Sequence, residues 1–158
     1  MVISDYPAPV ILANIRQNAE KDIPHLLGSV CSIQGHEWGV FDDWAYEQKH
    51  RFTRILAADC FWMPSQHLNL VCSMLHFLSL DPAATISAIA GFHTGRAKLA
   101  AFFDCAVEQG LDIDDIYEED DRGVRREWTK ERDGGREDHA ERKKWLVVAR
   151  LKRRPPSS

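Results

Sequence analysis

The chain has 158 residues, of which 44% are hydrophobic and 28% are charged, and its net charge is −4 with a pI near 6.0. This composition fits one soluble globular domain with a core of ordinary size. General nucleic-acid binders present a broad basic face to phosphates, and an acidic chain of this kind does not favour one, so we expect no nucleic-acid partner.

The four cysteines are far apart in the sequence and have apolar neighbours, which predicts reduced core thiols rather than a zinc site or a redox pair. The histidines also lack paired ligand spacing, so we expect no metal. Asp5 and the prolines after it interrupt any apolar leader, and no stretch is long enough to span a bilayer. We therefore predict a cytoplasmic protein, with a nuclear location also open, and no membrane partner.

Apolar residues recur along the chain with alternating strand-like and helix-like periods. Strands are predicted at 1–5, 29–33, 52–59, 84–90, 111–117 and 145–151. Helices are predicted at 7–20, 42–51, 65–78 and 96–109, and loops at 21–28 and 118–143, the second a long exposed hairpin loop. Alternation of this kind predicts a Rossmann-like α/β fold whose mainly parallel sheet has helices on both faces. The last two strands have no helix between them, which indicates an antiparallel last strand at an edge.

Carboxylates stand at the ends of two predicted strands, and ligands of open parallel sheets lie outside the carboxyl ends of the strands. Asp59 and Trp62 follow one such strand and are placed to meet a ligand; the alternative is a strand-end cap beside a core tryptophan. Asp5 can accept two hydrogen bonds from a ribose diol, or can instead cap the helix that follows it. Trp38, beside Gly39, can stack on an adenine or be an ordinary buried aromatic.

Two further polar residues follow the strand predicted at 84–90. His93 and Arg96 come directly after its carboxyl end, so we consider both as candidates for facing a ligand. The glycines around them are too sparse for a phosphate loop, and the chain contains neither a P-loop nor a nucleophile elbow. Nucleotide triphosphate hydrolysis and serine-based hydrolysis are therefore not favoured.

Several of these segments, taken in chain order, resemble one enzyme group. The segments are Asp5-Tyr6-Pro7, Asn14 with Asn18, Trp38-Gly39, residues 55–62 (ILAADCFW), residues 90–96 and residues 145–150. Together they resemble the seven-stranded methyltransferases that use S-adenosyl-L-methionine (AdoMet), in the nicotinamide N-methyltransferase-like and protein-lysine methyltransferase group, and most closely its fungal members. The resemblance covers nearly the whole chain, so we take 1–151 as a partial domain of this kind and 152–158 as a basic, Pro/Ser tail.

The resemblance implies a cofactor, an activity and a set of site residues. Asp5 corresponds to the acid that binds the AdoMet ribose, Trp38 to the tryptophan that contacts adenine, and Ala58 to the backbone position beside the methionine part. Asp59 and Trp62 match the group's catalytic signature, with tryptophan where the group has tyrosine. The implied activity is N-methylation of a small nitrogen heterocycle such as nicotinamide, or of a protein lysine or N-terminal amine.

In the group, the first strand and its glycine-rich cofactor loop precede the position of Met1, so we expect an N-terminally incomplete sheet. Without the close backbone approach of that loop, we expect the chain alone to bind AdoMet weakly or not at all. Natural sheets pair or cover their edges, so we also expect self-association through open sheet edges. A second hypothesis is therefore a non-catalytic interaction module that pairs with a partner or with itself. A third, an NAD-dependent oxidoreductase, shares the acid at Asp5 but does not explain the segment from Asp59 to Trp62.

Overall fold

A computed structural model describes residues 1–22 and 30–155, so most of the loop expected at 21–28 lies outside the described residues. The strands are β1 (Val2–Asp5), β2 (Ser32–Gly35), β3 (Arg54–Ala58), β4 (Thr85–Gly91), β5 (Leu111–Asp120), β6 (Arg125–Glu127) and β7 (Trp145–Arg153). The α-helices are α1 (Pro9–Asp22), α2 (Asp43–Glu47), α3 (His67–Phe77), α4 (Arg96–Glu108) and α5 (His139–Arg142). Short 3-10 turns occupy Pro64–Gln66 (η1), Phe92–Thr94 (η2) and Asp133–Gly135 (η3). None of the described helices has the length and apolar character needed to cross a bilayer.

The strands form two sheets. β1 and β2 are a parallel pair, and the larger sheet has the order β3-β4-β7-β5-β6. β3 is parallel to β4, whereas β7 runs antiparallel to both β4 and β5. The Rossmann-like α/β fold with an antiparallel last strand is thus confirmed, but the expected edge position of this strand was wrong. β7 pairs with both β4 and β5 and so lies inside the sheet, and the short antiparallel β6 forms the edge.

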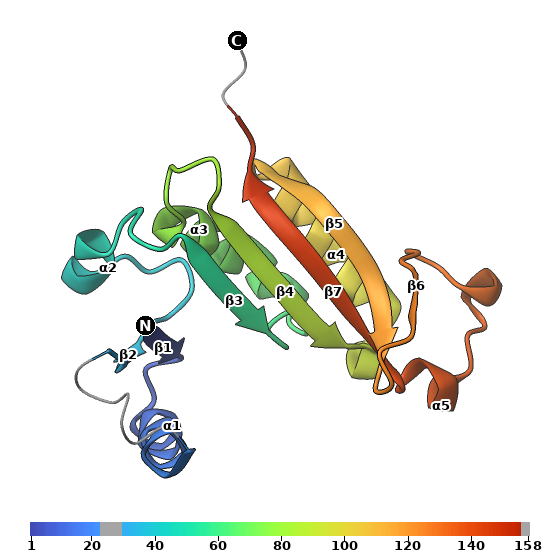
Figure 1. Cartoon of the computed structure of the whole chain (residues 1–158), viewed down its shortest axis with the longest axis horizontal. Helices are drawn as coiled ribbons and strands as arrows, with labels where there is room; N and C mark the ends of the chain where they lie inside the picture. The colour runs from blue at the N-terminus through green and yellow to red at the C-terminus, as the bar shows by residue number, and fades with distance from the viewer. Residues whose placement is uncertain (23–29, 156–158) are drawn as a thin grey trace.

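The core lies between the larger sheet and two helices. Figure 1 shows α3 and α4 side by side on one face of this sheet. α4 buries side chains at helical spacing, among them Leu99, Phe102 and Phe103, and β4 buries every second residue on the facing side. Because a strand sends alternate side chains to opposite faces, the remaining residues point the other way. Leu56 of β3 is 68% exposed on that side. In the described chain, helices therefore cover one face of this sheet, and the sequence prediction of helices on both faces was wrong.

The segment 118–143 is not the exposed loop that its charges predict. Glu118 is fully buried within β5, and the chain after it forms β6 and α5. Both oxygens of Glu118 accept hydrogen bonds from Arg96 at the start of α4, and Arg126 Nη2 lies 2.6 Å from Glu118 Oε2. Glu137 binds the same two arginines, and the ring of Phe92 lies 4.3 Å from the Arg96 guanidinium carbon. Paired charges pack this segment onto α4, and the sequence prediction was wrong because it counted charges without their partners.

The Glu118 carboxyl responds to two opposing effects. Burial by itself raises its pKa, but hydrogen bonds from Arg96 and Arg126 outweigh burial and lower the pKa below its ordinary value of 4.5. A carboxyl whose pKa is lower in the folded state contributes stability above its unfolded pKa. That contribution is lost as the pH falls from about 4.5 through the folded pKa.

We predict that Glu118→Gln lowers the free energy of unfolding by about 3 kcal/mol at neutral pH, because it removes one member of a buried ion pair. Urea unfolding followed by circular dichroism measures the change. Glu119→Gln is the matched control, since the neighbouring Glu119 pairs with Arg125 at a more exposed site. Below pH 4 the difference between wild type and Glu118→Gln should shrink, and equal stability of the two proteins at pH 7 would contradict the prediction.

Candidate functional site

The carboxyl ends of β3 and β4 lie side by side. The parallel register pairs Ala58 with Ile89, and the next residue, Asp59, donates its backbone N–H to the Ile89 carbonyl at 2.7 Å. Asp59 has a φ of 54°, a left-handed conformation that costs a non-glycine residue about 1 kcal/mol. β3 thus ends abruptly there, and the Asp59 side chain stays 57% exposed at the edge where parallel sheets bind ligands.

β1 also ends on a carboxylate, Asp5. Its Oδ1 accepts the Tyr6 backbone N–H at 2.7 Å, and the side chain is exposed. The helix-cap alternative is not what the structure shows, because α1 begins only at Pro9 and the carboxylate bonds to Tyr6 instead of the helix. Oδ2 has no hydrogen bond to any described residue, so this oxygen can accept one from a ligand hydroxyl.

The negative charges of Asp5 and Asp59 both affect the thiol of Cys60. The pKa of the Cys60 thiol is raised to about 11, first by burial and then by the negative charges of Asp5 and Asp59. Both carboxylates thus disfavour the thiolate of Cys60, although backbone pairing does not join the sheets of β1 and β3.

The loop after β2 carries Trp38 and is fixed to α3. His36 Nε2 and the Gly39 backbone N–H each lie 2.9 Å from the Ser73 hydroxyl. Gly39 has a φ of 80°, and a Cβ there would lie 2.8 Å from Asn69 Oδ1, so the position requires glycine. Trp38 is partly buried and packs against the core of the larger sheet, an arrangement that leaves part of its ring free for stacking.

His36, Ser73 and Asn69 carry this arrangement, and the sequence analysis did not single them out. Burial lowers the pKa of His36, so its imidazole is neutral in the contact with Ser73. The local signal in the sequence is Gly39 directly after Trp38, because glycine readily adopts the positive φ found there. Ser73 and Asn69 lie 30 or more positions after the loop residues they contact, and no local pattern connects them to the loop.

The two aromatic residues after Asp59 point in different directions. Phe61 is fully buried and packs on Phe102 with ring centroids 4.1 Å apart, whereas Trp62 is 47% exposed. The alternative of a core tryptophan is therefore not what the structure shows. Ala58, the last residue of β3, is exposed and small enough to let a ligand approach the backbone.

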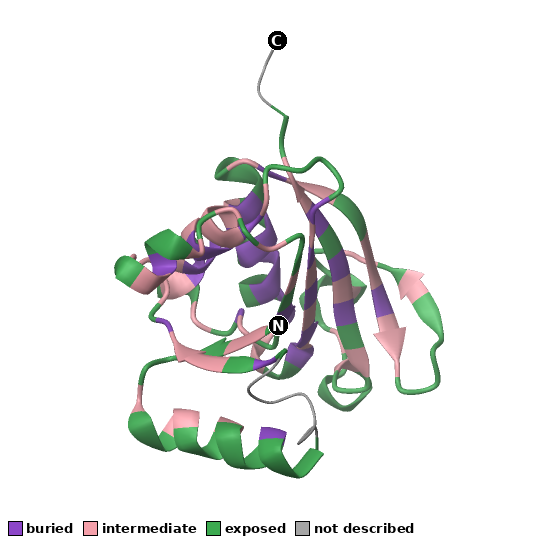
Figure 2. Cartoon of the chain, turned by 60° about the vertical axis from the view of Figure 1, so that its left-hand side comes forward, coloured by how far each residue is buried: buried purple, intermediate pink, exposed green. Residues whose placement is uncertain are grey.

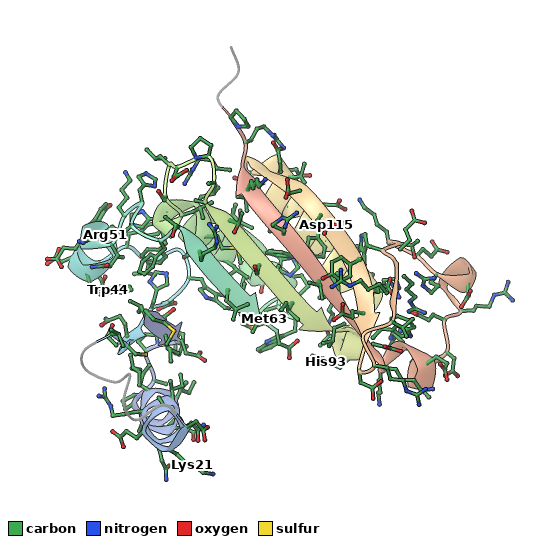
Figure 3. All side chains as sticks on the ribbon, viewed as in Figure 1. Lys21, Trp44, Arg51, Met63, His93 and Asp115 are labelled. Atoms are coloured by element: carbon green, nitrogen blue, oxygen red, sulfur yellow. The ribbon has the colours of Figure 1, made fainter. Side chains whose placement is uncertain are left out.

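The two candidates after β4 also separate. His93 Nε2 lies 3.8 Å from Asp59 Oδ2, and Figure 3 shows His93 at the same end of the sheet as Met63. Arg96 turns away into the cluster with Glu118 and is only 6% exposed. The expectation that Arg96 faces a ligand was wrong, because its guanidinium is required by two buried carboxylates.

Among the described residues, no group of three or more His, Cys, Asp or Glu side chains is arranged to hold a metal ion. All four cysteines are free, and of these Cys31 is buried and the others are partly buried.

Neither a scan against protein families nor a search of curated proteins finds a match. Solved structures do match. An rRNA (adenine-N1) methyltransferase from Catenulisporales acidiphilia with cosubstrate SAM, which is AdoMet, has a TM-score of 0.63 at 9% identity over 99% of this chain and 76% of its own. A putative sarcosine dimethylglycine methyltransferase from Galdieria sulphuraria has a TM-score of 0.64 at 11% identity over 97% and 69%. The cyclase SpnF has a TM-score of 0.64 at 9% identity over 97% and 66%.

The chain therefore has the Rossmann-like fold found in SAM-dependent methyltransferases, and it spans about two thirds to three quarters of the length of these structures. Because a cyclase has the same fold, the fold alone does not define the reaction. The reaction depends on the residues at the strand ends, among them Asp5, Trp38 and Asp59.

We predict that Asp5→Asn lowers the pKa of Cys60, since it removes a negative charge that disfavours the thiolate. The measurement is the rate of Cys60 alkylation by iodoacetamide between pH 8 and 10, read by peptide mass spectrometry, and Asp5→Asn should react faster than wild type. Glu20→Gln on the exposed face of α1 is the matched control and should leave the rate unchanged. Identical rates in wild type and Asp5→Asn would show that the charge of Asp5 does not act on the Cys60 thiol.

Proposed function

We propose that this chain is an AdoMet-dependent N-methyltransferase domain of the nicotinamide N-methyltransferase-like group. The observation that carries the proposal is that two strands of parallel pairs, β1 and β3, each end at their carboxyl edge on an exposed carboxylate, Asp5 and Asp59. A fold shared with SAM-dependent methyltransferases supports it. Ligands of such sheets bind at this edge.

The described residues fit the parts of AdoMet. Asp5 offers a free carboxylate oxygen to the ribose hydroxyls, and Trp38 offers the exposed part of its ring to adenine. Ala58 is exposed and has a side chain small enough for the methionine part to pass close to the backbone of β3. Asp59 and Trp62 stand at the end of the same strand, where an acceptor would lie, and both are exposed.

When bound, AdoMet supplies a methyl group on a sulfonium centre. The residues of this chain hold the acceptor nitrogen in line with that methyl group, which is the main requirement for such a transfer. Trp62 offers a flat apolar surface to the acceptor, and Asp59 offers a hydrogen-bond acceptor or a counter-charge. A small nitrogen heterocycle such as nicotinamide and a protein amine both fit these two features.

The named neighbours suggest nitrogen-containing acceptors of different sizes. One is named for sarcosine and dimethylglycine, another for N1 of an rRNA adenine. A net charge of −4 and a pair of carboxylates at the site favour a neutral or cationic acceptor over RNA. We therefore place this chain with the enzymes that act on a small molecule or a protein amine in the cytoplasm or nucleus.

Titration calorimetry with AdoMet tests the proposal. We expect weak, saturable binding, because the chain has no glycine-rich loop for close backbone approach. Asp5→Asn should weaken binding about tenfold, since hydrogen bonds to a charged group contribute about 1.5 kcal/mol or more. Glu20→Gln serves as the control for loss of one charge. The proposal fails if wild type shows no AdoMet binding at millimolar cofactor, or if Asp5→Asn binds as well as wild type.

A second candidate function is an interaction module that pairs with a partner or with a second copy of this chain. In the described chain β1 pairs only with β2, and β3 only with β4, so each strand has one edge without a strand neighbour. Figure 1 shows the two sheets as separate units. Leu56 on β3 and Val10 on α1 are 68% and 76% exposed, and Figure 2 shows α1 exposed along most of its length. Unpaired edges beside apolar side chains are sites of strand addition.

Sedimentation velocity tests this second function. We expect wild type to self-associate as its concentration rises, and Leu56→Lys to remain mainly monomeric, because a lysine on an edge strand opposes strand pairing. Leu80→Lys is the matched control: Leu80 is similarly exposed, at 63%, but lies in the turn before β4 rather than on a strand. A stable monomer at high concentration in wild type would argue against self-pairing.

A further inference from the structure

Asp59 and His93 lie close together at the carboxyl ends of two neighbouring strands. Asp59 ends β3, His93 lies in η2 directly after β4, and Oδ2 of the acid is 3.8 Å from Nε2 of the imidazole. The left-handed backbone of Asp59 fixes where its carboxylate leaves the strand. Both side chains are about half exposed, at 57% and 50%, so a ligand can reach them. We call these two residues the Asp59–His93 pair.

The position of the imidazole depends on a glycine. A Cβ at Gly91 would lie 3.2 Å from Nδ1 of His93, closer than most real contacts, so the ring occupies space that a larger residue would restrict. The residue between them, Phe92, is 1% exposed and anchors η2 in the core. The imidazole is thus held over the end of β4 by its backbone neighbours, with Nε2 directed at Asp59.

Neighbouring groups approach the imidazole from several elements. Asp59 approaches it from β3. From β7 the nearest side chain at Gly91 is the uncharged Leu146. Arg96, which follows η2 in the chain, directs its charge into the buried cluster with Glu118. An imidazole is a side chain that can accept a proton from a ligand, and a carboxylate beside it can bind a cationic ligand.

We propose that His93 is the base that removes a proton from the acceptor amine, with Asp59 as the carboxylate that binds the ammonium group beside it. The inference rests on the proposed methyltransferase function and specifies its acceptor. The N–H proton of an ammonium acceptor passes to Nε2 of His93, and the freed lone pair forms the N–C bond to the methyl group. The C–S bond breaks with its electrons on sulfur, and the imidazolium then loses its proton to water. The separation of 3.8 Å between Asp59 Oδ2 and His93 Nε2 leaves both atoms free to accept hydrogen bonds from one ammonium group.

This role selects between the two acceptor classes. An alkyl amine is protonated at neutral pH and cannot attack until a base takes its proton. The ring nitrogen of nicotinamide carries no proton at neutral pH, so a base brings it no advantage. The Asp59–His93 pair is therefore suited to an aliphatic or protein amine, and nicotinamide would not need it.

Binding of a small amine tests the pair without AdoMet and without turnover. In the full chain with labelled histidines, n-butylamine should shift the His93 imidazole signal in a saturable way, and nicotinamide should not. Asp59→Asn should weaken this response about tenfold, because a charge-assisted hydrogen bond is lost. His93→Gln assigns the signal, and His139→Asn on exposed α5 is the control that keeps the response. An unchanged His93 signal, or an equal response to nicotinamide, overturns the proposal.

Methyl transfer provides the second measurement. With n-butylamine as acceptor, His93→Gln should reduce the rate at pH 7 by about 100-fold, a typical contribution of general-base catalysis. The deficit should disappear as the pH approaches the pKa of the amine itself, where the free base no longer needs His93. AdoMet binding should be unchanged in His93→Gln. A pH-independent deficit overturns the base role, whereas absence of AdoMet binding in wild type counts against the proposed function and leaves the amine-binding result to decide the pair.

Discussion

The parallel pairing of β3 with β4 is the constraint on which the site depends. Its register runs from Arg54 opposite Thr85 to Ala58 opposite Ile89, so β3 ends two residues before β4 ends at Gly91. Asp59 and η2 therefore follow neighbouring strand ends. β7 supports this register from the other side by pairing with β4 from Ile86 to Gly91. A shift of one residue would turn the buried alanines and isoleucines of β4 toward solvent, so the core itself fixes the site.

Two residues three positions apart illustrate how the same segment serves structure and chemistry. Arg96 is buried, satisfied by Glu118 and Glu137, and joins α4 to the segment after β5. His93 is exposed and has one carboxylate nearby. Because Arg96 pairs with Glu118 and Glu137, its charge does not neutralise the strand-end acids Asp5 and Asp59. The buried cluster thus stabilises the fold and also keeps the site negative, which favours an amine or a sulfonium as ligand.

The sequence predicted the elements whose evidence is local. Apolar periodicity gave α4, whose inward residues recur at helical spacing, and β4, whose apolar run is short and bounded by turns. It also placed Asp5 and Asp59 at strand ends. The segment 118–143 was missed because its burial depends on Arg96, more than 20 residues earlier, and a charged sequence with a distant partner looks the same as a solvated one. The docking of the Trp38 loop on Ser73 was missed for the same reason.

Both proposed functions depend on the joint between the two sheets, by which we mean the contacts that set the position of β1 relative to β3. No backbone pairing connects β1 to β3 in the described chain, so their relative position rests on side-chain contacts, chiefly those of Ser73 with His36 and Gly39. Cofactor binding requires Asp5 and Asp59 to keep a fixed separation, because AdoMet has a fixed length between its ribose and its methyl group. Strand addition would use the free backbone edge of β3, beside the same Ala58 that would contact AdoMet. A ligand at the strand ends and a strand at this edge therefore both act on the joint. Either one stabilises an arrangement that the Ser73 hydrogen bonds and the packing of Trp38 against the core now maintain.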